Sequence, residues 1–400
     1  MHATALFRPT FTDLRSEVER RVTQGVPADE ITALIDQFLA SGGDLPAPIV
    51  EYDGTVTWLY RNANAEHVAV VGDIVGYDVH TTRMARIAGT DLFYMTAQLP
   101  IDAQIGYAFA VDNPPPEGDE AQAWEEWLGR CILDPLNPQR IAETNPLRMV
   151  SVLTMPSAQA ALDLPEHDPD SIVYTAMHIV SSATIGVWRR IWVSIPLGYD
   201  PNLYYSTIYF VAGEGYLLAG RTPEIAAALV ELQEIAPAVL VFLEDGAEHG
   251  IEWLGRLLAD AVIPFIEARY AVRGSAPYRA ICGASGAGAA SLAVALSRPD
   301  LFGGAAAQSP SADLTSQAVA ALLARAAGRN QAFPRFYIDV GRYEQAESIE
   351  SVHALCATLI EGGASVAYQE FAGDHSFLGW RATLPDALRF HLGASPLDEL

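Results

Sequence analysis

Lysine is absent from this 400-residue sequence. All 24 basic residues are arginine, 49 residues are Asp or Glu, and the formal net charge is −25. Without lysine, catalysis through a lysine Schiff base is excluded. Nucleic acids and anionic membranes both need a cationic protein surface, so we expect neither as a partner.

Cysteine is scarce, and long apolar runs are missing. The three cysteines, Cys131, Cys282 and Cys356, are far apart and odd in number, which is typical of free thiols in a reducing compartment. Their spacing fits no metal site, and we expect no metal and no other cofactor. No run reaches the ~20 apolar residues of a membrane-spanning helix, and residues 1–21 hold no basic region followed by an apolar stretch. We therefore expect a cytoplasmic protein without a secretion signal.

Half of the residues are apolar and 18% are charged, which is the balance of a globular protein of two or three domains. Residues 1–50 are predicted to be a helical segment, because apolar residues recur at helical spacing between positions 10 and 42. Residues 51–160 carry short alternating runs between turn residues, which predicts an all-β sandwich. Its expected strands lie at 55–60, 67–72, 92–97 and 107–111, and the acidic stretch 117–130 is expected to be an excursion or an exposed loop.

From 165 to 400, apolar β-type runs alternate with helical patterns. This order predicts an α/β domain with a mostly parallel sheet and helices on both faces. The expected strands are 171–179, 188–196, 206–212, 238–244, 278–282, 303–307, 335–340 and 366–371, and the expected helices are 223–234, 251–269, 286–298, 313–328, 345–361 and 381–391. The short connection between the first two strands predicts an antiparallel hairpin at one edge. The polar, proline-bearing stretch 163–170 is expected to link the two domains.

One short motif carries most of the functional signal. Residues 281–288 read Ile-Cys-Gly-Ala-Ser-Gly-Ala-Gly, between a β-type run and a helix-compatible run. A serine at a sharp strand-to-helix turn between small residues is the nucleophile elbow of α/β-hydrolases. Larger side chains at 283 or 287 would collide with the adjoining strand or helix. The motif predicts Ser285 as a nucleophile.

A serine hydroxyl needs a histidine to take its proton and a carboxylate to orient that histidine. In this fold the chain order is serine, acid, histidine. His353, His375 and His391 follow Ser285, and only His375 lies directly after the last expected strand and before the last helix, where a base can reach the carboxyl end of the sheet. We predict His375 as the base.

Three carboxylates are candidates for the acid. Glu344 lies just past the strand 335–340, on the turn into the next helix, and is our choice. Asp339 is the alternative, although a side chain within a strand tends to point into a face of the sheet. Asp374 ranks third, because adjacent side chains usually diverge and it is next to His375.

Oxyanion stabilisation requires backbone N–H donors. One donor is expected from Gly286, the residue after the nucleophile. The other is expected from Gly213 or Glu214, in the glycine-rich turn Ala212-Gly213-Glu214-Gly215-Tyr216 after the strand 206–212.

These residues, together with several longer runs, resemble the enterochelin (ferric enterobactin) esterases and their esterase-D-like relatives. The matching runs beyond the elbow are Val71-Gly72-Asp73, residues 83–94 (RMARIAGTDLFY), residues 134–138 (DPLNP), residues 189–201 (RRIWVSIPLGYDP), residues 298–303 (RPDLFG), and Gly373-Asp374-His375 followed by Trp380-Arg381. The resemblance covers nearly all of the chain past residue 50. It implies an immunoglobulin-like sandwich in front of an α/β-hydrolase.

The resemblance further implies hydrolysis of the serine ester bonds of a cyclic trilactone siderophore, with release of iron. Carried over by position, Ser285 is the nucleophile, His375 the base, and Glu344 or Asp339 the acid. Residues expected to contact the substrate on the same grounds are Tyr216, His249, Trp380 and Arg381.

The chain also departs from the family pattern. The loop usually carries Asp-Gly where Ala212-Gly213 stands here, and His249 stands where an arginine is common. An iron-loaded trianionic siderophore requires a cationic pocket, for which Arg221, Arg342 and Arg381 are the candidates. Two other hypotheses stay open. One is an esterase acting on carbohydrate-linked acetyl or feruloyl esters or on general small-molecule esters, and the other is a non-catalytic binding protein on a hydrolase scaffold. Sugar binding would use exposed aromatic side chains of the front domain, with candidates Trp58, Tyr60, Tyr77, Trp124 and Trp127. The sequence predicts no oligomeric state.

Overall fold

The computed structural model describes residues 10–43, 47–72, 75–76, 78–118, 120–142, 148–158, 174–182, 186–244, 250–312, 314, 316–327 and 333–393. The chain forms two compact units. The front unit comprises Met1–Glu143 and Leu147–Gln159, and the back unit comprises Thr144–Pro146 and Ala160–Leu400. The expected linker 163–170 and residue Tyr77 lie outside the described residues. None of the helices in the described ranges is long and apolar enough to cross a bilayer.

The front unit contains two four-stranded antiparallel sheets. One has the order β1-β2-β5-β4, with β1 Ile49–Val50, β2 Thr55–Arg61, β5 Leu92–Gln98 and β4 Ala85–Arg86; the other has the order β3-β6-β8-β7, with β3 Val68–Val71, β6 Gln104–Val111, β8 Met149–Thr154 and β7 Arg140–Ala142. Aromatic side chains of the first sheet pack edge-on against those of the second, Trp58 on Tyr107 and Tyr60 on Phe109. These rings form the core between the sheets and confirm the predicted sandwich.

The acidic stretch 117–130, expected as an excursion or an exposed loop, is partly helical. It contains helix α3 (Ala121–Gly129), and Trp127 of this helix is fully buried. The Trp127 indole N–H donates to the carbonyl oxygen of Asn113 at 3.0 Å. Trp124 and Trp127, three positions apart, face the same side of the helix, a pattern that the surrounding carboxylates hide in the sequence.

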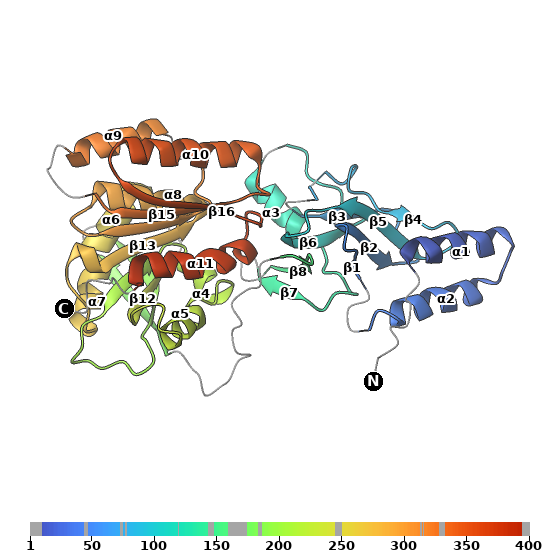
Figure 1. Ribbon diagram of the computed structural model, residues 1–400, viewed down its shortest axis with the longest axis horizontal. Helices are drawn as coiled ribbons and strands as arrows, with labels where there is room; N and C mark the ends of the chain where they lie inside the picture. Colours follow the sequence, from blue (N-terminus) through green and yellow to red (C-terminus); the bar gives the residue numbers. More distant parts are fainter. Residues whose placement is uncertain are drawn as a thin grey trace. The chain divides into compact units, whose positions relative to one another are not determined.

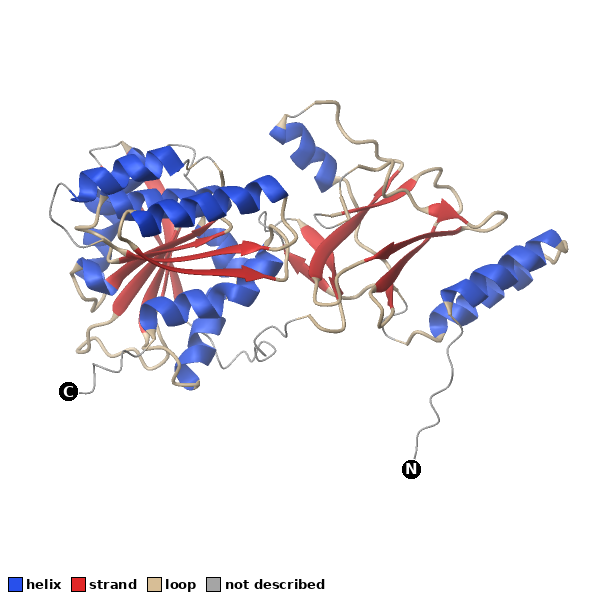
Figure 2. Cartoon of the chain, turned by 45° about the horizontal axis from the view of Figure 1, so that its top comes forward, coloured by secondary structure: helices blue, strands red, loops and turns tan. Residues whose placement is uncertain are grey.

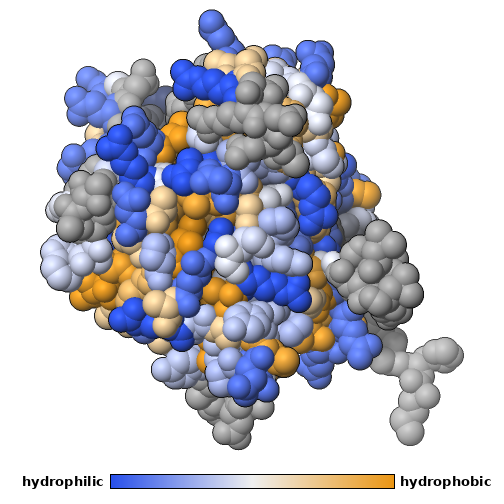
Figure 3. Space-filling model, turned by 90° about the vertical axis from the view of Figure 1, so that its left-hand side faces the viewer, coloured by the Kyte–Doolittle hydropathy of each residue, from blue (hydrophilic) through white to orange (hydrophobic). Residues whose placement is uncertain are grey.

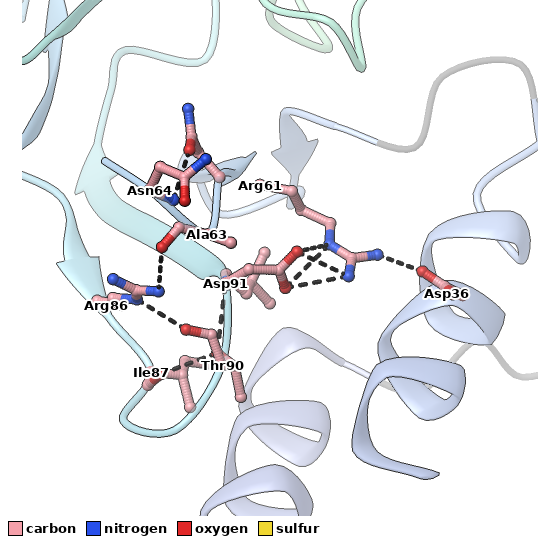
Figure 4. Close-up of polar contacts among 10 residues, drawn as sticks. Asp36, Arg61, Ala63, Asn64, Arg86, Ile87, Thr90 and Asp91 are labelled. Carbon is pink, nitrogen blue, oxygen red and sulfur yellow. Dashed lines mark hydrogen bonds and ion pairs between the residues drawn. The ribbon is translucent and has the colours of Figure 1, made fainter. Parts of the chain in front are cut away.

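A pair of N-terminal helices belongs to the front unit. Helix α1 (Phe11–Thr23) begins with a capping box between Thr10 and Asp13, and α2 is Ala28–Ala40. Their buried apolar residues share one hydrophobic cluster with residues of the sandwich. Figure 4 shows a polar tie beside this cluster, in which the Arg61 guanidinium of β2 binds Asp36 of α2 and the carboxylate of Asp91.

The back unit is built on an eight-stranded sheet of order β16-β15-β14-β13-β11-β12-β10-β9. The strands are β9 Thr175–Ser182, β10 Val187–Ser194, β11 Ser206–Phe210, β12 Ala238–Leu243, β13 Arg279–Ala284, β14 Gly304–Gln308, β15 Arg335–Gly341 and β16 Ser365–Phe371. Neighbours from β12 to β16 are parallel, whereas β10 is antiparallel to both β12 and β9. The sheet and its edge hairpin are as predicted.

Helices cover both faces of this sheet (Figures 1 and 2). Their bounds are α4 Gly213–Leu218, α5 Thr222–Glu231, α6 Ile251–Leu257, the π-helical turn Leu258–Val262, α7 Ile263–Arg269, the 3₁₀ turn Ala276–Tyr278, α8 Ser285–Ser297, α9 Ser316–Ala327, α10 Ala346–Glu361 and α11 Phe377–Leu392. Helices α6 to α10 contribute to one large apolar core, and α11 packs with α5 on the opposite face. Helix α8 is buried along almost its whole length, so its position is fixed tightly.

The surface is mixed in polarity. On the face in Figure 3, hydrophobic side chains are interspersed with hydrophilic ones. Several apolar side chains of the edge hairpin β9–β10 are exposed, among them Met177, Ile179 and Trp188.

Candidate active site

The turn at Ser285 is a strained strand-to-helix junction. Strand β13 ends at Ala284 and helix α8 begins at Ser285, whose φ is 54°. A non-glycine residue with this left-handed backbone is uncommon and marks strain. A Cβ atom at Gly283 would lie 2.3 Å from the carbonyl oxygen of Ala287, so only glycine fits there. The collision expected from the sequence is therefore present. Ser285 itself is partly exposed, and Gly286 is exposed.

The carboxyl ends of the neighbouring strands bring several site residues to the same edge of the sheet. Phe210 of β11 pairs with Cys282 of β13, and Ala284 of β13 pairs with Gln308 of β14. Because these neighbouring strands are parallel, the turns that follow β11, β13 and β14, which carry Gly213, Ser285 and Ser309, lie at the same edge of the sheet. The N–H of Ser311 also donates to the Ser285 carbonyl oxygen at 3.1 Å.

Three adjacent strands end in the same strained conformation. Ala212 after β11, Ser285 after β13 and Ser309 after β14 have φ values of 52°, 54° and 44°. Left-handed non-glycine residues cost of order 1 kcal/mol or more each and cluster at functional sites. Their concentration at one sheet edge supports a functional site at this edge.

The predicted oxyanion donors lie at two helix starts on this edge. Helix α4 begins at Gly213, and a Cβ atom there would lie 2.6 Å from the Cα atom of Phe242. The N–H groups in the first turn of a helix have no acceptor within that helix. The N–H groups of Gly213, Glu214 and Gly286 all belong to such first turns, at the ends of neighbouring strands. The sequence predicted no helix after β11, because α4 has only six residues and two of them are glycine.

His375 and Glu344 are hydrogen-bonded. The distance from His375 Nδ1 to Glu344 Oε2 is 2.7 Å, and the side-chain exposure is 37% for His375 and 2% for Glu344. An ionised carboxylate only accepts hydrogen bonds, so in the neutral imidazole Nδ1 carries the proton and Nε2 carries the lone pair that can act as a base. The N–H of Gly341 donates to the other Glu344 oxygen at 2.7 Å. The carboxylate is therefore fixed in place before any substrate is present.

The other two carboxylate candidates have different surroundings. Asp339 is fully buried, and its Oδ2 accepts from Tyr337 Oη at 3.2 Å and from Gln308 Nε2 at 3.3 Å. Burial raises the pKa of Asp339 to about 7. Asp374 accepts from the hydroxyl of Ser376, the N-cap of α11. Of the three candidates, Glu344 is the one that the structure brings to His375 Nδ1.

Two residues expected to contact substrate are core residues. Tyr216 and Trp380 are each 1% exposed. The Tyr216 hydroxyl donates to Gln308 Oε1, and the Trp380 indole N–H donates to Ser309 Oγ, both at 2.9 Å. The expectation that these rings line the substrate is wrong for this conformation, because neither presents a surface. Both instead donate hydrogen bonds to buried side chains at the end of β14.

The remaining expected contacts are polar. Arg381 lies partly buried on α11, and its pKa is lowered, first by burial and then by the positive charge of Arg221. Glu224, whose Oε1 lies 3.4 Å from Arg221 Nε, opposes this lowering. His249 lies outside the described residues.

Gln308 and Ser309 were not predicted as site residues. Both are buried at the end of the alanine-rich strand β14, and both bond to side chains of the site. The only signal for them in the sequence is a polar pair directly after three alanines.

The front unit has a pocket, but its charges are already engaged. The pocket, of about 590 Å³, is lined in part by Arg61, Arg86, Thr90 and Asp91. Arg61 binds Asp91 and Asp36, and the Arg86 guanidinium donates to the carbonyl oxygens of Thr90 and Ala63 (Figure 4). Arg61 therefore ties helix α2 to the sandwich, and Arg86 ties two loops of the sandwich to each other.

The proposed sugar-binding aromatics are mostly core residues. Trp58 and Trp127 are 0% exposed and Tyr60 is 6% exposed, so the interpretation of these three as an exposed platform is wrong. Trp124 is partly buried, packs edge-on against Trp127, and donates to the Gly118 carbonyl oxygen. Across the described residues, no group of three His, Cys, Asp or Glu side chains is placed to hold a metal ion.

Comparison with known proteins agrees with this geometry. Residues 182–391, more than half of the chain, match the family model described as putative esterase. The chain belongs to this esterase family. Residues 55–163 match the model of the enterochelin esterase N-terminal domain, which places the chain with the enterochelin esterases. It is an esterase with an α/β-hydrolase fold.

Solved structures of enterobactin esterases share this fold. The ferric enterobactin esterase from Salmonella typhimurium matches with a TM-score of 0.71 and 22% identity, over 86% of this chain and 95% of that one. The enterobactin esterase from Shigella flexneri, solved in the presence of 2,3-dihydroxy-N-benzoyl-serine, matches with a TM-score of 0.68 and 24% identity, over 84% and 92%. The same enzyme solved in the presence of enterobactin gives 0.68 and 22%, over 84% and 92%.

Proposed function

We propose that this esterase works through a serine nucleophile, with Ser285, His375 and Glu344 as the catalytic triad. The observation that carries the proposal is the 2.7 Å hydrogen bond between His375 Nδ1 and Glu344 Oε2 at the sheet edge that also carries Ser285. In the neutral imidazole this bond keeps the proton on Nδ1 and the lone pair on Nε2, as proton removal from a serine hydroxyl requires. The buried carboxylate also stabilises the imidazolium that forms in the reaction.

In the proposed reaction, Ser285 Oγ attacks the ester carbonyl while His375 Nε2 takes its proton. The N–H groups of Gly286 and of Gly213 or Glu214 stabilise the tetrahedral oxyanion. His375 then protonates the departing alcohol, which leaves an acyl-enzyme on Ser285. Water, activated by the same histidine, releases the acid and restores the free hydroxyl.

A siderophore-type ester is the substrate that we favour. Support comes from the enterochelin esterase N-terminal match and from relatives solved with enterobactin or 2,3-dihydroxy-N-benzoyl-serine. The alternative ester classes use the same triad and differ only in the alcohol and acyl parts. Iron would arrive as cargo of the substrate and takes no part in the bond cleavage.

Ser285→Ala tests the nucleophile. With purified protein and short p-nitrophenyl esters, kcat should fall by roughly 10⁴-fold or more, while circular dichroism and the melting temperature stay near those of the wild type. A fluorophosphonate probe should label the wild type at Ser285 and leave the variant unlabelled. Absence of labelling in active, folded wild type would overturn the triad and favour a non-catalytic or differently built site.

The substrate class needs a separate measurement. Enterobactin, with and without Fe³⁺, should be opened to linear products containing 2,3-dihydroxybenzoyl-serine, detected by chromatography and mass spectrometry. Arg381→Gln should raise KM for the ferric complex more than KM for a neutral p-nitrophenyl ester. Faster turnover of feruloyl or acetyl sugar esters than of enterobactin would contradict the siderophore proposal and leave the triad intact.

A further inference from the structure

Ser309 is one of four side chains that form a closed ring of contacts with two members of the proposed triad, Glu344 and His375. Its hydroxyl donates to Glu344 Oε1 at 2.5 Å and accepts from the Trp380 indole N–H at 2.9 Å. Glu344 Oε2 in turn accepts from His375 Nδ1, and the His375 ring packs edge-on against Trp380 at a centroid distance of 5.1 Å. The ring runs from Ser309 to Glu344, His375, Trp380 and back.

This ring fixes both the acid and the base. Ser309 is 1% exposed, Trp380 is 1% exposed, and the Glu344 side chain is 2% exposed, so their hydrogen bonds are shielded from water. Hydrogen bonds to a charged group are stronger in such surroundings. The His375 ring is the only member with substantial exposure, at 37%.

The neighbouring residue reinforces the arrangement. Gln308 Nε2 donates to the Trp380 carbonyl oxygen at 2.8 Å and to Thr383 Oγ1 at 2.7 Å, while its Oε1 accepts from Tyr216. Gln308 and Ser309, at the end of β14, therefore bond to the backbone and to the indole of Trp380. Gln308 also connects α11, which carries Trp380, to α4, which carries Tyr216 and the proposed oxyanion donors Gly213 and Glu214.

The backbone at Ser309 gives an independent reason to assign a role to its hydroxyl. Its φ is 44°, a conformation in which glycine is free of strain and serine is not. A serine side chain at this position therefore has an energetic disadvantage that its two hydrogen bonds offset.

We infer that Ser309 is a positioning residue of this esterase, whose hydroxyl holds the Glu344 carboxylate and the Trp380 indole so that His375 is aligned for catalysis. The inference rests on the proposed triad. Ser309 acts through Glu344 and Trp380 and touches no reacting atom.

Ser309→Ala and Ser309→Gly test the inference together. Glycine relieves the strain, so the Ser309→Gly protein should be at least as well folded as Ser309→Ala, yet both should lose kcat by about tenfold to a hundredfold, as expected for a lost hydrogen bond to a charged group. KM for a p-nitrophenyl ester should stay within about twofold, because ground-state binding is untouched. The acidic limb of kcat/KM should move to higher pH, since a carboxylate with one donor fewer stabilises the imidazolium more strongly.

Ser194→Ala is the matched control. Ser194 is a buried serine of β10 whose hydroxyl has no hydrogen-bond partner among the described residues. This variant should keep kcat and the pH profile. Trp380→Phe removes the other bond of the ring, and the double variant with Ser309→Ala should lose little more than the worse single variant.

The outcomes separate the two proposals. If the wild type reacts with a fluorophosphonate at Ser285 and both Ser309 variants keep kcat and the pH profile, the positioning role is refuted and the triad stands. If Ser309→Ala loses activity but Ser309→Gly does not, backbone strain and not the hydroxyl is responsible, which also refutes it. If wild-type Ser285 is not labelled, the triad itself fails.

Discussion

Each unit buries a carboxylate in a hydrogen-bond network, but only the network of the back unit reaches solvent. In the front unit, Asp134 is 0% exposed and accepts from the Tyr107 hydroxyl at 2.7 Å and from the Leu136 N–H at 2.8 Å. Its partners lie within the sandwich, and Asn137 donates to the same tyrosine. This network starts and ends inside the core.

In the back unit, Glu344 is nearly as well buried, but its hydrogen bond runs to a histidine with 37% exposure. The two networks use similar residue types and similar distances. The difference is that one connects structural groups to each other, and the other connects a fixed charge to an accessible ring nitrogen. Burial of a carboxylate alone therefore does not distinguish the proposed site from the sandwich core; the hydrogen bond of Glu344 to an accessible histidine does.

Removal of the Glu344 charge should give the largest effect and sharpens the comparison within the back unit. Glu344→Gln should lower kcat for p-nitrophenyl esters by roughly 10³–10⁴-fold, because an amide neither orients the required tautomer nor stabilises the imidazolium. Asp339→Asn, which changes the fully buried alternative, should cost less than about tenfold. A larger loss in Asp339→Asn than in Glu344→Gln would reverse our choice of acid.

The front-unit carboxylate should affect stability, not catalysis. Burial raises the pKa of Asp134 to about 6, so the folded protein holds a proton that the unfolded chain releases above its ordinary pKa of about 4. Stability should therefore fall as pH rises from about 4 to about 6, by at most about 3 kcal/mol from this group. Asp134→Asn should remove this contribution.

Calorimetry of the full chain across this pH range measures the difference between wild type and Asp134→Asn. Asp339 also has a raised pKa, but it is the same in both proteins and cancels. Esterase kcat should be equal in the two proteins. Parallel stability curves for both would show that Asp134 does not titrate in this window.

The smallest effect is expected at the tie between helices and sandwich. Arg61→Gln removes the ion pairs to Asp36 and Asp91 shown in Figure 4 and should cost about 1 kcal/mol, because the Arg61 side chain is only partly buried. Arg20→Gln, which breaks the exposed pair with Glu17 on α1, is the control and should cost less than Arg61→Gln. Chemical denaturation measures both, and equal losses would show that Arg61 adds nothing beyond a surface pair.

Much of the back unit was predictable because its signals are local. The strands are short apolar runs bounded by turn residues. Seven of the eight described strands begin and end within two residues of their predicted bounds, and β9 overlaps its predicted range 171–179. The prediction missed two helices whose local pattern is obscured. Carboxylates surround Trp124 and Trp127 in α3, and α4 contains two glycines. Both helices depend on burial against the rest of their unit, which a local pattern does not show.

The site was predictable only in part for the same reason. The elbow at Ser285 could be predicted because steric collision restricts the residues next to it, such as Gly283, to small side chains. Ser309 could not, because its partners Glu344 and Trp380 are 35 and 71 positions away in the chain. Contacts of this range depend on how the strands align.

By itself, the sequence determined that lysine chemistry is excluded, that a strained serine turn joins a strand to a helix, and that a histidine follows the last strand. The first feature follows from composition alone. The other two follow from residues that are close together in the chain, where local steric effects and element order decide the structure. The tertiary structure alone decided which carboxylate meets His375 and that Tyr216 and Trp380 are buried. Glu344 and Asp339 are five positions apart, and only the strand register and the turn at Gly341 send one to the histidine and the other into the core.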